Sequence, residues 1–329
     1  MPESPPPSAP PPAGAGSVFG GPAPSGPVAA RDAATVMLVR DTATADGPAL
    51  EVCMLRRHLN SDFVGGAYVF PGGKVDDDDR TAGAGEACVG RSDAAASDML
   101  GIESGGLAFW VAALRECFEE AGVMLAYSEG TGPGGELVDV TEPGVRARLA
   151  ACRVELNAGR VGFLDACRAQ GLRLAVDRVH YFSHWITPEP APKRYDTRFF
   201  VTALPTGQIP VHDDHETTDT VWVRPSEALA RAEAGEFDLI FPTIKNLEAI
   251  ARFSTSVELL AAAAAVERVP TVLPRVVADE RGFRILLPGD PGYDEAVSGA
   301  GPTGAPMSSS DMGDVIRSIG SDGRGGDRR

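Results

Sequence analysis

The chain has 329 residues, of which 43% are hydrophobic, so it is long enough to form a sizeable buried core. Its 46 acidic residues outnumber its 30 basic residues, and the formal charge of −16 argues against a general nucleic-acid-binding surface. The five cysteines are an odd number without a CxxC pair. They argue against a disulfide framework or a zinc site and favour reduced thiols that pack in the core.

In chain order, the sequence predicts two strands (34–40 and 50–57), a short third strand (67–73) that ends at a Gly-Gly pair, and a long helix (107–125). Two further helices follow at 145–157 and 162–170, then three strands at 179–187, 194–204 and 219–223. Helices at 226–235, 242–253 and 256–269 and a strand pair within 271–290 complete the list. Strands that precede, interrupt and follow helices predict an α/β fold with a mixed sheet covered by helices.

Both ends of the chain are biased in composition. Residues 1–30 are rich in Pro, Gly, Ser and Ala and lack the charged start and apolar stretch of a signal peptide, and residues 296–329 are similarly biased. We therefore predict two disordered extensions around a single domain at 31–295, with its C-terminal helices and strand pair at 243–288. The chain has no apolar run long enough to span a membrane, so we expect a cytoplasmic location, and a homodimer stays an open alternative.

The helix at 107–125 carries the most informative pattern. Its carboxylates Glu116, Glu119 and Glu120 are spaced i, i+3 and i+4, so they share one face, about 5–6 Å apart between Cβ atoms. Three anions this close repel each other, and a hard cation such as Mg²⁺ or Mn²⁺ would relieve the repulsion. Arg115 precedes Glu119 by four residues and is placed to orient that carboxylate. Gly122 suits the end of the helix.

An acidic helix face is more often simply a solvated surface. The Gly-Gly pair upstream shifts the interpretation, because glycines that follow a strand let backbone N–H groups approach an anionic ligand closely. Gly72 and Gly73 are therefore candidate substrate-binding residues. A backbone that binds anions, combined with carboxylates that bind a metal, is the combination that phosphoanhydride hydrolysis requires.

These residues resemble a known family. Residues 115–123, Arg-Glu-Cys-Phe-Glu-Glu-Ala-Gly-Val, match the R-E-U-x-E-E-x-G-U half of the Nudix box, with Cys117 at a position that is usually aliphatic. Gly73 resembles the leading glycine of the box, but 28 extra residues separate it from Arg115 compared with the usual G-x5-E-x7-R spacing. Such a split box resembles the branch of the Nudix hydrolase superfamily that includes acyl-coenzyme A diphosphatases. Asp79 stands six residues after Gly73, where an uninterrupted box has its first glutamate.

The resemblance implies a Nudix-type α/β/α sandwich with a mixed sheet, a helical insertion at about 77–106 inside the box, and extra helices. It also implies Mg²⁺ or Mn²⁺ as cofactor and a nucleoside diphosphate derivative as substrate, with neither a nucleic acid nor a membrane as partner. Part of a coenzyme A motif is present, since Arg57 and residues 70–73 match it. The position of the motif's second arginine is Asp62, and His58 replaces a small residue.

The resemblance assigns Glu116, Glu119 and Glu120 to the metal and to catalysis, with Arg115 in an orienting role. Glu216 resembles a distal acidic residue that some Nudix enzymes use as an extra ligand or base, and loop acidity is an equally good interpretation. His212 and His215 are weaker candidates for the base. Arg57, Arg194 and Arg198 are candidate diphosphate-binding residues, but Arg194 and Arg198 could instead neutralise Asp196 in a structural network.

The sequence therefore predicts a metal-dependent pyrophosphohydrolase that cleaves a diphosphate linkage, with CoA or acyl-CoA as a candidate substrate. An ADP-ribose or NADH-type pyrophosphatase is the alternative within the same chemistry. A non-catalytic Nudix-fold sensor is the alternative of another class, and the intact Arg-Glu-x-x-Glu-Glu pattern argues against it.

Overall fold

The structure, a computed structural model, describes residues 28–296 apart from residues 46, 61–63, 82, 190, 192 and 280–281. Its centre is an eight-stranded mixed sheet with the strand order β10-β7-β8-β1-β2-β3, in which β4 also pairs with β1 and β9 with β2. The strands of this sheet are β1 (Arg31–Thr44), β2 (Gly47–Arg57), β3 (Tyr68–Val69), β4 (Gly72–Lys74), β7 (His180–Ile186), β8 (Tyr195–Ala203), β9 (Thr217–Val223) and β10 (Thr271–Val272). Strands β1 and β8 run parallel, whereas β1 and β2 form an antiparallel hairpin.

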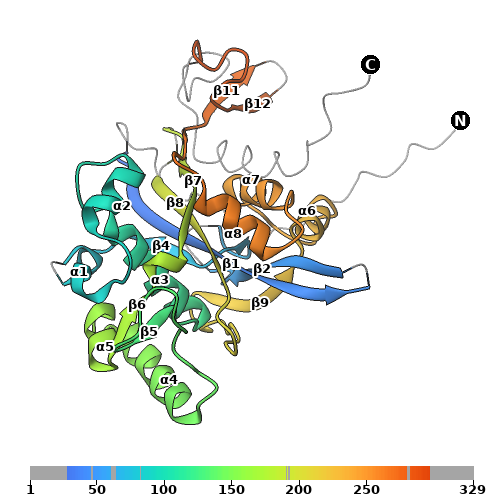
Figure 1. Cartoon of the computed structure of the whole chain (residues 1–329). Helices are drawn as coiled ribbons and strands as arrows, with labels where there is room; N and C mark the ends of the chain where they lie inside the picture. Colours follow the sequence, from blue (N-terminus) through green and yellow to red (C-terminus); the bar gives the residue numbers. More distant parts are fainter. Residues whose placement is uncertain are drawn as a thin grey trace, which may run out of the picture.

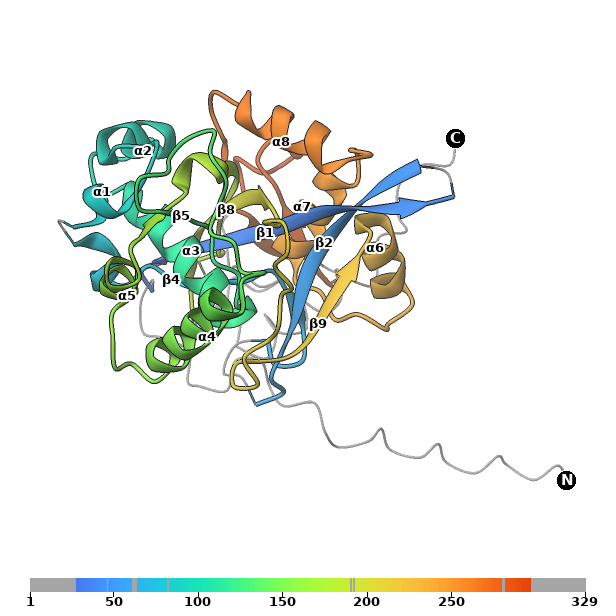
Figure 2. The same ribbon diagram turned by 60° about the horizontal axis from the view of Figure 1, so that its bottom comes forward.

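Helices cover both faces of the sheet (Figures 1 and 2). On one face lie α1 (Ala84–Ala87), α2 (Asp93–Leu100), α3 (Leu107–Ala121), α4 (Pro143–Asn157) and α5 (Phe163–Ala169). On the other lie α6 (Pro225–Glu233), α7 (Phe241–Ile250) and α8 (Ser256–Ala264). Alternate residues of β1 explain the two layers, because Ala34 and Val36 pack in the core with α3, whereas Met37 and Val39 pack in the core with α7 and α8. The predicted α/β/α sandwich is confirmed.

The long central helix α3 is shorter than the predicted 107–125. It ends at Ala121 because Gly122 adopts a left-handed conformation (φ 68°), and the Gly122 N–H caps the carbonyls of the last turn. The side chains that face the sheet, among them Trp110 and Leu114, are fully buried. The Trp110 indole donates to the Val179 carbonyl (2.9 Å), which satisfies the polar atom of this large core residue.

The insertion predicted at about 77–106 is helical. It contains a 3₁₀ turn (Asp77–Arg80), α1 and α2, and the last two pack against α3. Two small antiparallel pairs lie outside the main sheet, β5 (Ala126–Ser128) with β6 (Leu172–Leu174) and β11 (Arg275–Asp279) with β12 (Gly282–Leu286). The second pair was predicted, whereas β5 and β6 were not, because three-residue strands carry too short a pattern.

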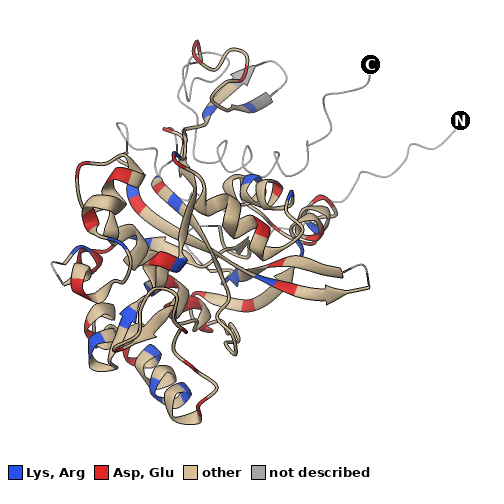
Figure 3. Ribbon diagram, viewed as in Figure 1, with Lys and Arg blue, Asp and Glu red and all other residues tan. Residues whose placement is uncertain are grey.

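The predicted disordered extensions lie outside the described residues except for residues 28–30 and 296. No helix within the described part of the chain is long and apolar enough to cross a membrane. All five cysteines are buried and free. Acidic and basic residues are interspersed over the described ribbon (Figure 3). The domain boundaries, the homodimer, the cytoplasmic location and the absence of nucleic-acid binding stay predictions.

Candidate active site

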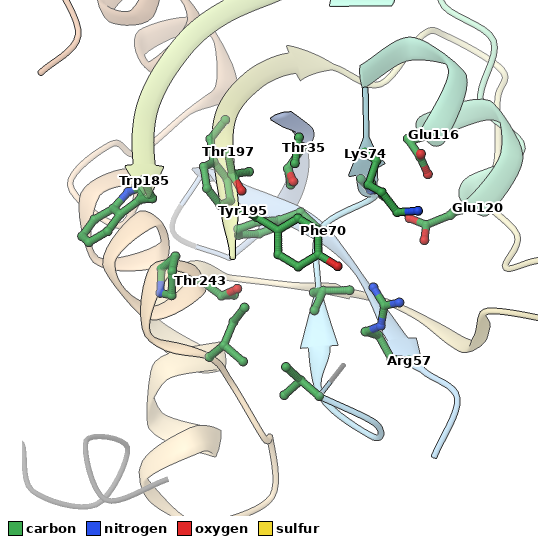
Figure 4. A pocket seen from close by; sticks show the side chains of 18 of the residues that line it. Thr35, Arg57, Phe70, Lys74, Glu116, Glu120, Trp185, Tyr195, Thr197 and Thr243 are labelled. Carbon is green, nitrogen blue, oxygen red and sulfur yellow. Dashed lines mark hydrogen bonds between the residues drawn. The ribbon is translucent and has the colours of Figure 1, made fainter. Parts of the chain in front are cut away.

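A cavity of about 880 Å³ opens where the C-terminal half of α3 meets the β4 segment. Glu116, Glu119 and Glu120 line it from α3, and Gly72 and Gly73 line it from β4. Figure 4 shows Glu116 and Glu120 reaching the cavity from the helix, with Lys74 beside them. The predicted carboxylates and the predicted glycines therefore meet in one cavity, although more than 40 residues separate them in the sequence.

The two glycines are required by contacts on opposite faces of the sheet. A Cβ atom on Gly73 would lie 2.3 Å from Glu116 Oε1, whereas a Cβ atom on Gly72 would lie 2.5 Å from Thr35 Oγ1 and 2.6 Å from the Ala34 carbonyl oxygen. At such distances a side chain fits only if the contacted atoms move. The backbone of β4 can therefore approach the carboxylate of Glu116 only because residue 73 has no side chain.

Arg115 connects the two halves of the split motif. Its guanidinium is buried and donates to both carboxylate oxygens of Asp79 (3.0 Å each), to Glu116 Oε1 (2.9 Å) and to Glu119 Oε2 (2.8 Å). It also donates to the Lys74 carbonyl (2.8 Å), which holds β4 against the helix. A guanidinium matches this bidentate arrangement because its donors form a planar fork.

The Asp79 carboxylate does not reach into the cavity. The side chain is 1% exposed, both of its oxygens bond Arg115, and one of them also accepts the Asp76 backbone N–H (2.8 Å). Burial raises the pKa of Asp79, and the bidentate contact with Arg115 opposes that shift. Asp79 stands where an uninterrupted box has its first glutamate. The 3₁₀ turn places it beside Arg115, and its carboxylate fixes the position of the guanidinium. The other three aspartates of the run, Asp76 to Asp78, are exposed.

Burial and mutual repulsion make the α3 carboxyl groups hard to ionise. Burial raises the pKa of Glu116 to about 7, and the Glu119 carboxylate adds to the shift while Arg115 opposes it. Burial also raises the pKa of Glu119, again against Arg115. For Glu120, burial and the Glu116 carboxylate raise the pKa well above its ordinary value, although the Gly72 N–H donates to its Oε2 (2.9 Å). A nearby positive charge would stabilise the ionised form of these three carboxyl groups.

The donor set suits a hard divalent cation, because all the candidate ligands are carboxylate oxygens. Within the described ranges, no group of three or more His, Cys, Asp or Glu side chains meets the geometry of a metal site. The local contacts explain this result, since Arg115 donates to Glu116 and Glu119, and Glu120 accepts the Gly72 N–H. The residues fit a divalent ion in composition, burial and charge.

Two further predicted residues line the same cavity. Arg57 projects from β2, its guanidinium lies 4.0 Å from the Glu216 carboxylate, and its buried Nε has no hydrogen-bond partner among the described residues. Glu216 lies in the exposed loop before β9, and its side chain is 66% exposed. His215 of the same loop also lines the cavity, whereas His212 bonds Thr220 and does not line it. Asp62 lies outside the described residues.

Arg194 and Arg198 do not line the cavity. Arg194 donates to the backbone carbonyls of Thr187 (3.0 Å) and Val28 (2.7 Å). Arg198 is buried and pairs with Asp196 (2.5 Å), with its guanidinium over the Phe109 ring. Arg198 thus follows the structural-network alternative, and neither arginine contributes a guanidinium to the site.

Several cavity residues were not among the predicted site residues. Lys74 directly follows Gly73 and is exposed beside the carboxylates, so its place after the glycine pair was the one available clue. Thr197, Thr243 and Trp185 line the far part of the cavity from β8, α7 and β7. A threonine or tryptophan within an apolar run looks like a core residue, because the run alone does not show that a cavity lies beside it.

Comparisons with known proteins agree with the motif. A family model described as the NUDT19 Nudix domain matches residues 92–250. A chicken (Gallus gallus) protein named acyl-coenzyme A diphosphatase NUDT19 is 30% identical to this chain over 88% of the chain and 87% of its own length. The human (Homo sapiens) protein of the same name is also 30% identical, over 73% and 71%. The chain belongs to the Nudix hydrolase family, in the NUDT19 branch.

A solved structure agrees with this membership. The crystal structure of a Nudix hydrolase from Alicyclobacillus acidocaldarius superposes with a TM-score of 0.54 at 27% identity, and the match covers 71% of this chain and 96% of that one. As a Nudix hydrolase, this protein is an enzyme that acts on phosphorus-containing anhydrides, so the sensor alternative is not supported. Nudix hydrolases generally need a divalent metal ion, and their substrates are nucleoside diphosphate derivatives.

Proposed function

We propose that this Nudix hydrolase is a CoA and acyl-CoA diphosphatase that uses Mg²⁺ or Mn²⁺. Water cleaves the P–O–P linkage of the substrate, and the products are adenosine 3′,5′-bisphosphate and 4′-phosphopantetheine or its S-acyl form. The observation that carries the proposal is the meeting of Glu116, Glu119 and Glu120 with the Gly72-Gly73 backbone in one cavity. The names of the relatives, which belong to the acyl-coenzyme A diphosphatases, supply the substrate class.

Glu116, Glu119 and Glu120 are the residues that would hold the divalent ion. When bound, such an ion neutralises phosphate oxygens and lowers the pKa of water. The chain's own part follows from its contacts. Arg115 fixes the orientation of Glu116 and Glu119 through two hydrogen bonds. The exposed Glu216 lines the cavity beside Arg57 and is the group that would accept the proton of a water molecule there.

The cations of the cavity support a substrate with several phosphates. Arg57 and Lys74 both line the cavity beside the carboxylates, and Arg57 is close enough to Glu120 to lower the pKa of that carboxyl group. A guanidinium binds phosphate oxygens in a bidentate way, and an ammonium group binds them as a point charge. These two residues are the proposed contacts for the phosphates that the divalent ion leaves uncovered.

The proposal is tested by incubating the full chain with CoA, octanoyl-CoA, ADP-ribose, NADH and diadenosine tetraphosphate. Each substrate is offered with Mg²⁺, with Mn²⁺ and with EDTA, and the products are identified by mass spectrometry. We expect 3′,5′-ADP from the two CoA substrates and no product in EDTA. Turnover of ADP-ribose or NADH at higher kcat/KM than either CoA substrate would instead establish the alternative pyrophosphatase activity.

Two amide variants test the proposed ligands. Glu119→Gln and Glu120→Gln keep the size of each side chain but remove its charge, so we expect kcat to fall by about two to four orders of magnitude with the fold intact. Glu155→Gln, at an exposed carboxylate on α4 that pairs with Arg160, is the matched control. Near-normal kcat in both cavity variants would contradict the proposed metal site.

A further inference from the structure

The cavity has two chemically different parts. Its charged lining residues all come from α3, β2, the β4 segment or the loop of Glu216. The opposite part is lined from β7, β8 and α7 and by Pro274, Val276 and Ile285, and no described lining residue there is charged. We call this opposite part the uncharged arm and define it by Trp185, Thr197, Phe199, Phe241 and Thr243. Figure 4 shows Trp185, Thr197 and Thr243 on one side of the cavity and Glu116, Glu120 and Arg57 on the other.

Strand register explains how the uncharged arm forms. Strands β1 and β8 are parallel, with Ala33 opposite Thr197 and Thr35 opposite Phe199. Because side chains alternate along a strand, Thr35, Thr197 and Phe199 share the sheet face that α7 covers. Thr35 also touches the position of Gly72, so it lies where the uncharged arm joins the charged part of the cavity. The arm and the carboxylates thus lie on opposite faces of the sheet but share one continuous cavity.

Three threonine hydroxyl groups lie along this route. Thr35, Thr197 and Thr243 all line the cavity, and none of their hydroxyls forms a hydrogen bond with another described residue. Thr243 is only 2% exposed, so bulk water has little access to it. Thr35 and Thr197 are half-buried, and a hydroxyl that faces a cavity can both donate to a ligand and accept from it. The row of hydroxyls therefore suits an uncharged ligand that carries amide groups.

The end of the uncharged arm is apolar. Trp185 and Phe241 meet edge to face, with ring centroids 5.9 Å apart and an interplanar angle of 87°. Two rings at right angles do not form a parallel slot for a flat base, which stacks on the face of an aromatic ring. An aliphatic chain has no such requirement and gains from contact with both rings.

We propose that the uncharged arm binds the S-acyl-pantetheine half of the substrate, so that the adenosine 3′,5′-bisphosphate half lies at the charged part of the cavity. This inference rests on the proposed function. The pantetheine half carries two amides and a thioester but no charge, which matches the three hydroxyls and the apolar end. The adenosine half carries a 3′-phosphate, and burying that dianion in the arm without a cation would be costly. Arg57 and Lys74 offer the cations at the other part.

The test uses the two products as separate inhibitors of the metal-loaded enzyme. Octanoyl-4′-phosphopantetheine probes one half of the site and adenosine 3′,5′-bisphosphate probes the other. Thr197→Val and Thr243→Val remove one hydroxyl each with little change in volume. We expect each variant to raise Ki for octanoyl-phosphopantetheine by about 2- to 10-fold, the loss of one hydrogen bond, and to leave Ki for the bisphosphate within 2-fold. Thr218→Val, at an exposed residue of β9 outside the cavity, is the control.

A third variant, Thr197→Trp, fills the arm instead of removing a hydrogen bond. It should lower kcat/KM for octanoyl-CoA by a larger factor than it changes Ki for the bisphosphate. Its melting temperature shows whether the variant has folded. Three results would overturn the inference: an unchanged Ki for octanoyl-phosphopantetheine in both valine variants, a change confined to the bisphosphate, or no inhibition of the wild type by octanoyl-phosphopantetheine. Failure of the wild type to cleave any CoA substrate would be a separate result, against the proposed function itself.

Discussion

Replacing Glu116 by glutamine should make the free energy of unfolding of the metal-free protein depend less on pH. Burial raises the pKa of this carboxyl group from an ordinary value of 4.5 to about 7. Between these two values the unfolded chain has already lost the proton that the folded chain keeps, so the free energy of unfolding falls as pH rises. Integrated from pH 5 to pH 8, the loss is roughly 2 to 3 kcal/mol, which is a large part of the stability of a typical domain.

The assay is urea unfolding in EDTA at pH 5, 6, 7 and 8. We expect the unfolding free energy of the wild type to decline by roughly 2 to 3 kcal/mol more than that of Glu116→Gln across this range. Any constant effect of the substitution, for example on the Arg115 hydrogen bond, cancels because each protein is compared with itself at another pH. The control is Glu227→Gln, at an exposed carboxylate of α6 away from the cavity. Equal declines in the wild type and in Glu116→Gln would refute the reasoning.

The same experiment with saturating Mg²⁺ tests the metal site. A cation binds the ionised carboxylates and not the protonated ones, so Mg²⁺ should stabilise the wild type more at pH 8 than at pH 5. At a concentration 100 times the dissociation constant, the gain is about 2.7 kcal/mol. In Glu116→Gln the gain should be smaller at pH 8, because one charged oxygen ligand is lost.

Three further predictions concern the scaffold of the site. Gly73→Ala should lower kcat by at least about 10-fold with little change in melting temperature, because the new Cβ displaces only the end of the Glu116 side chain. In Gly72→Ala the new Cβ meets backbone atoms of β1, so the melting temperature should fall by several degrees. Asp79→Asn removes a buried partner of Arg115 and should cost about 3 kcal/mol in urea unfolding, while the exposed neighbour Asp78→Asn should change it by less than about 0.5 kcal/mol. Burial raises the pKa of Cys53, Cys88 and Cys167 to about 12, so a disulfide reagent at pH 8 should titrate these thiols only after denaturation; rapid reaction in the native state would contradict their burial.

The metal-binding half of the site was predictable because its signal is local. Glu116, Glu119 and Glu120 belong to one helix, so their spacing alone places them on one face whatever the rest of the fold does. The role of Asp79 was not predictable in this way. Thirty-six residues separate it from Arg115, and only the 3₁₀ turn and the packing of α1 and α2 on α3 bring the two side chains together.

Strand β8 shows a second limit of sequence reasoning. The arginines near its start left two alternatives open, a diphosphate contact or a structural network with Asp196. The odd-numbered Thr197 and Phe199 line the cavity, and Arg198 faces away and pairs with Asp196. In a half-buried strand, hydrophobic alternation tells which face is inside. Strand β8 is central and covered by helices on both faces, so its pattern does not distinguish the two faces.

The glycine pair joins the two parts of the cavity for a geometric reason. Successive residues of a strand point to opposite faces, so Gly72 and Gly73 each leave one face open. On the α3 face the space is occupied by the Glu116 carboxylate, and on the α7 face it is occupied by the Thr35 hydroxyl. One dipeptide therefore lets a charged group and a neutral polar group approach the same stretch of backbone. A substrate that is ionic at one end and amide-rich at the other can then meet both groups beside the same two residues of β4.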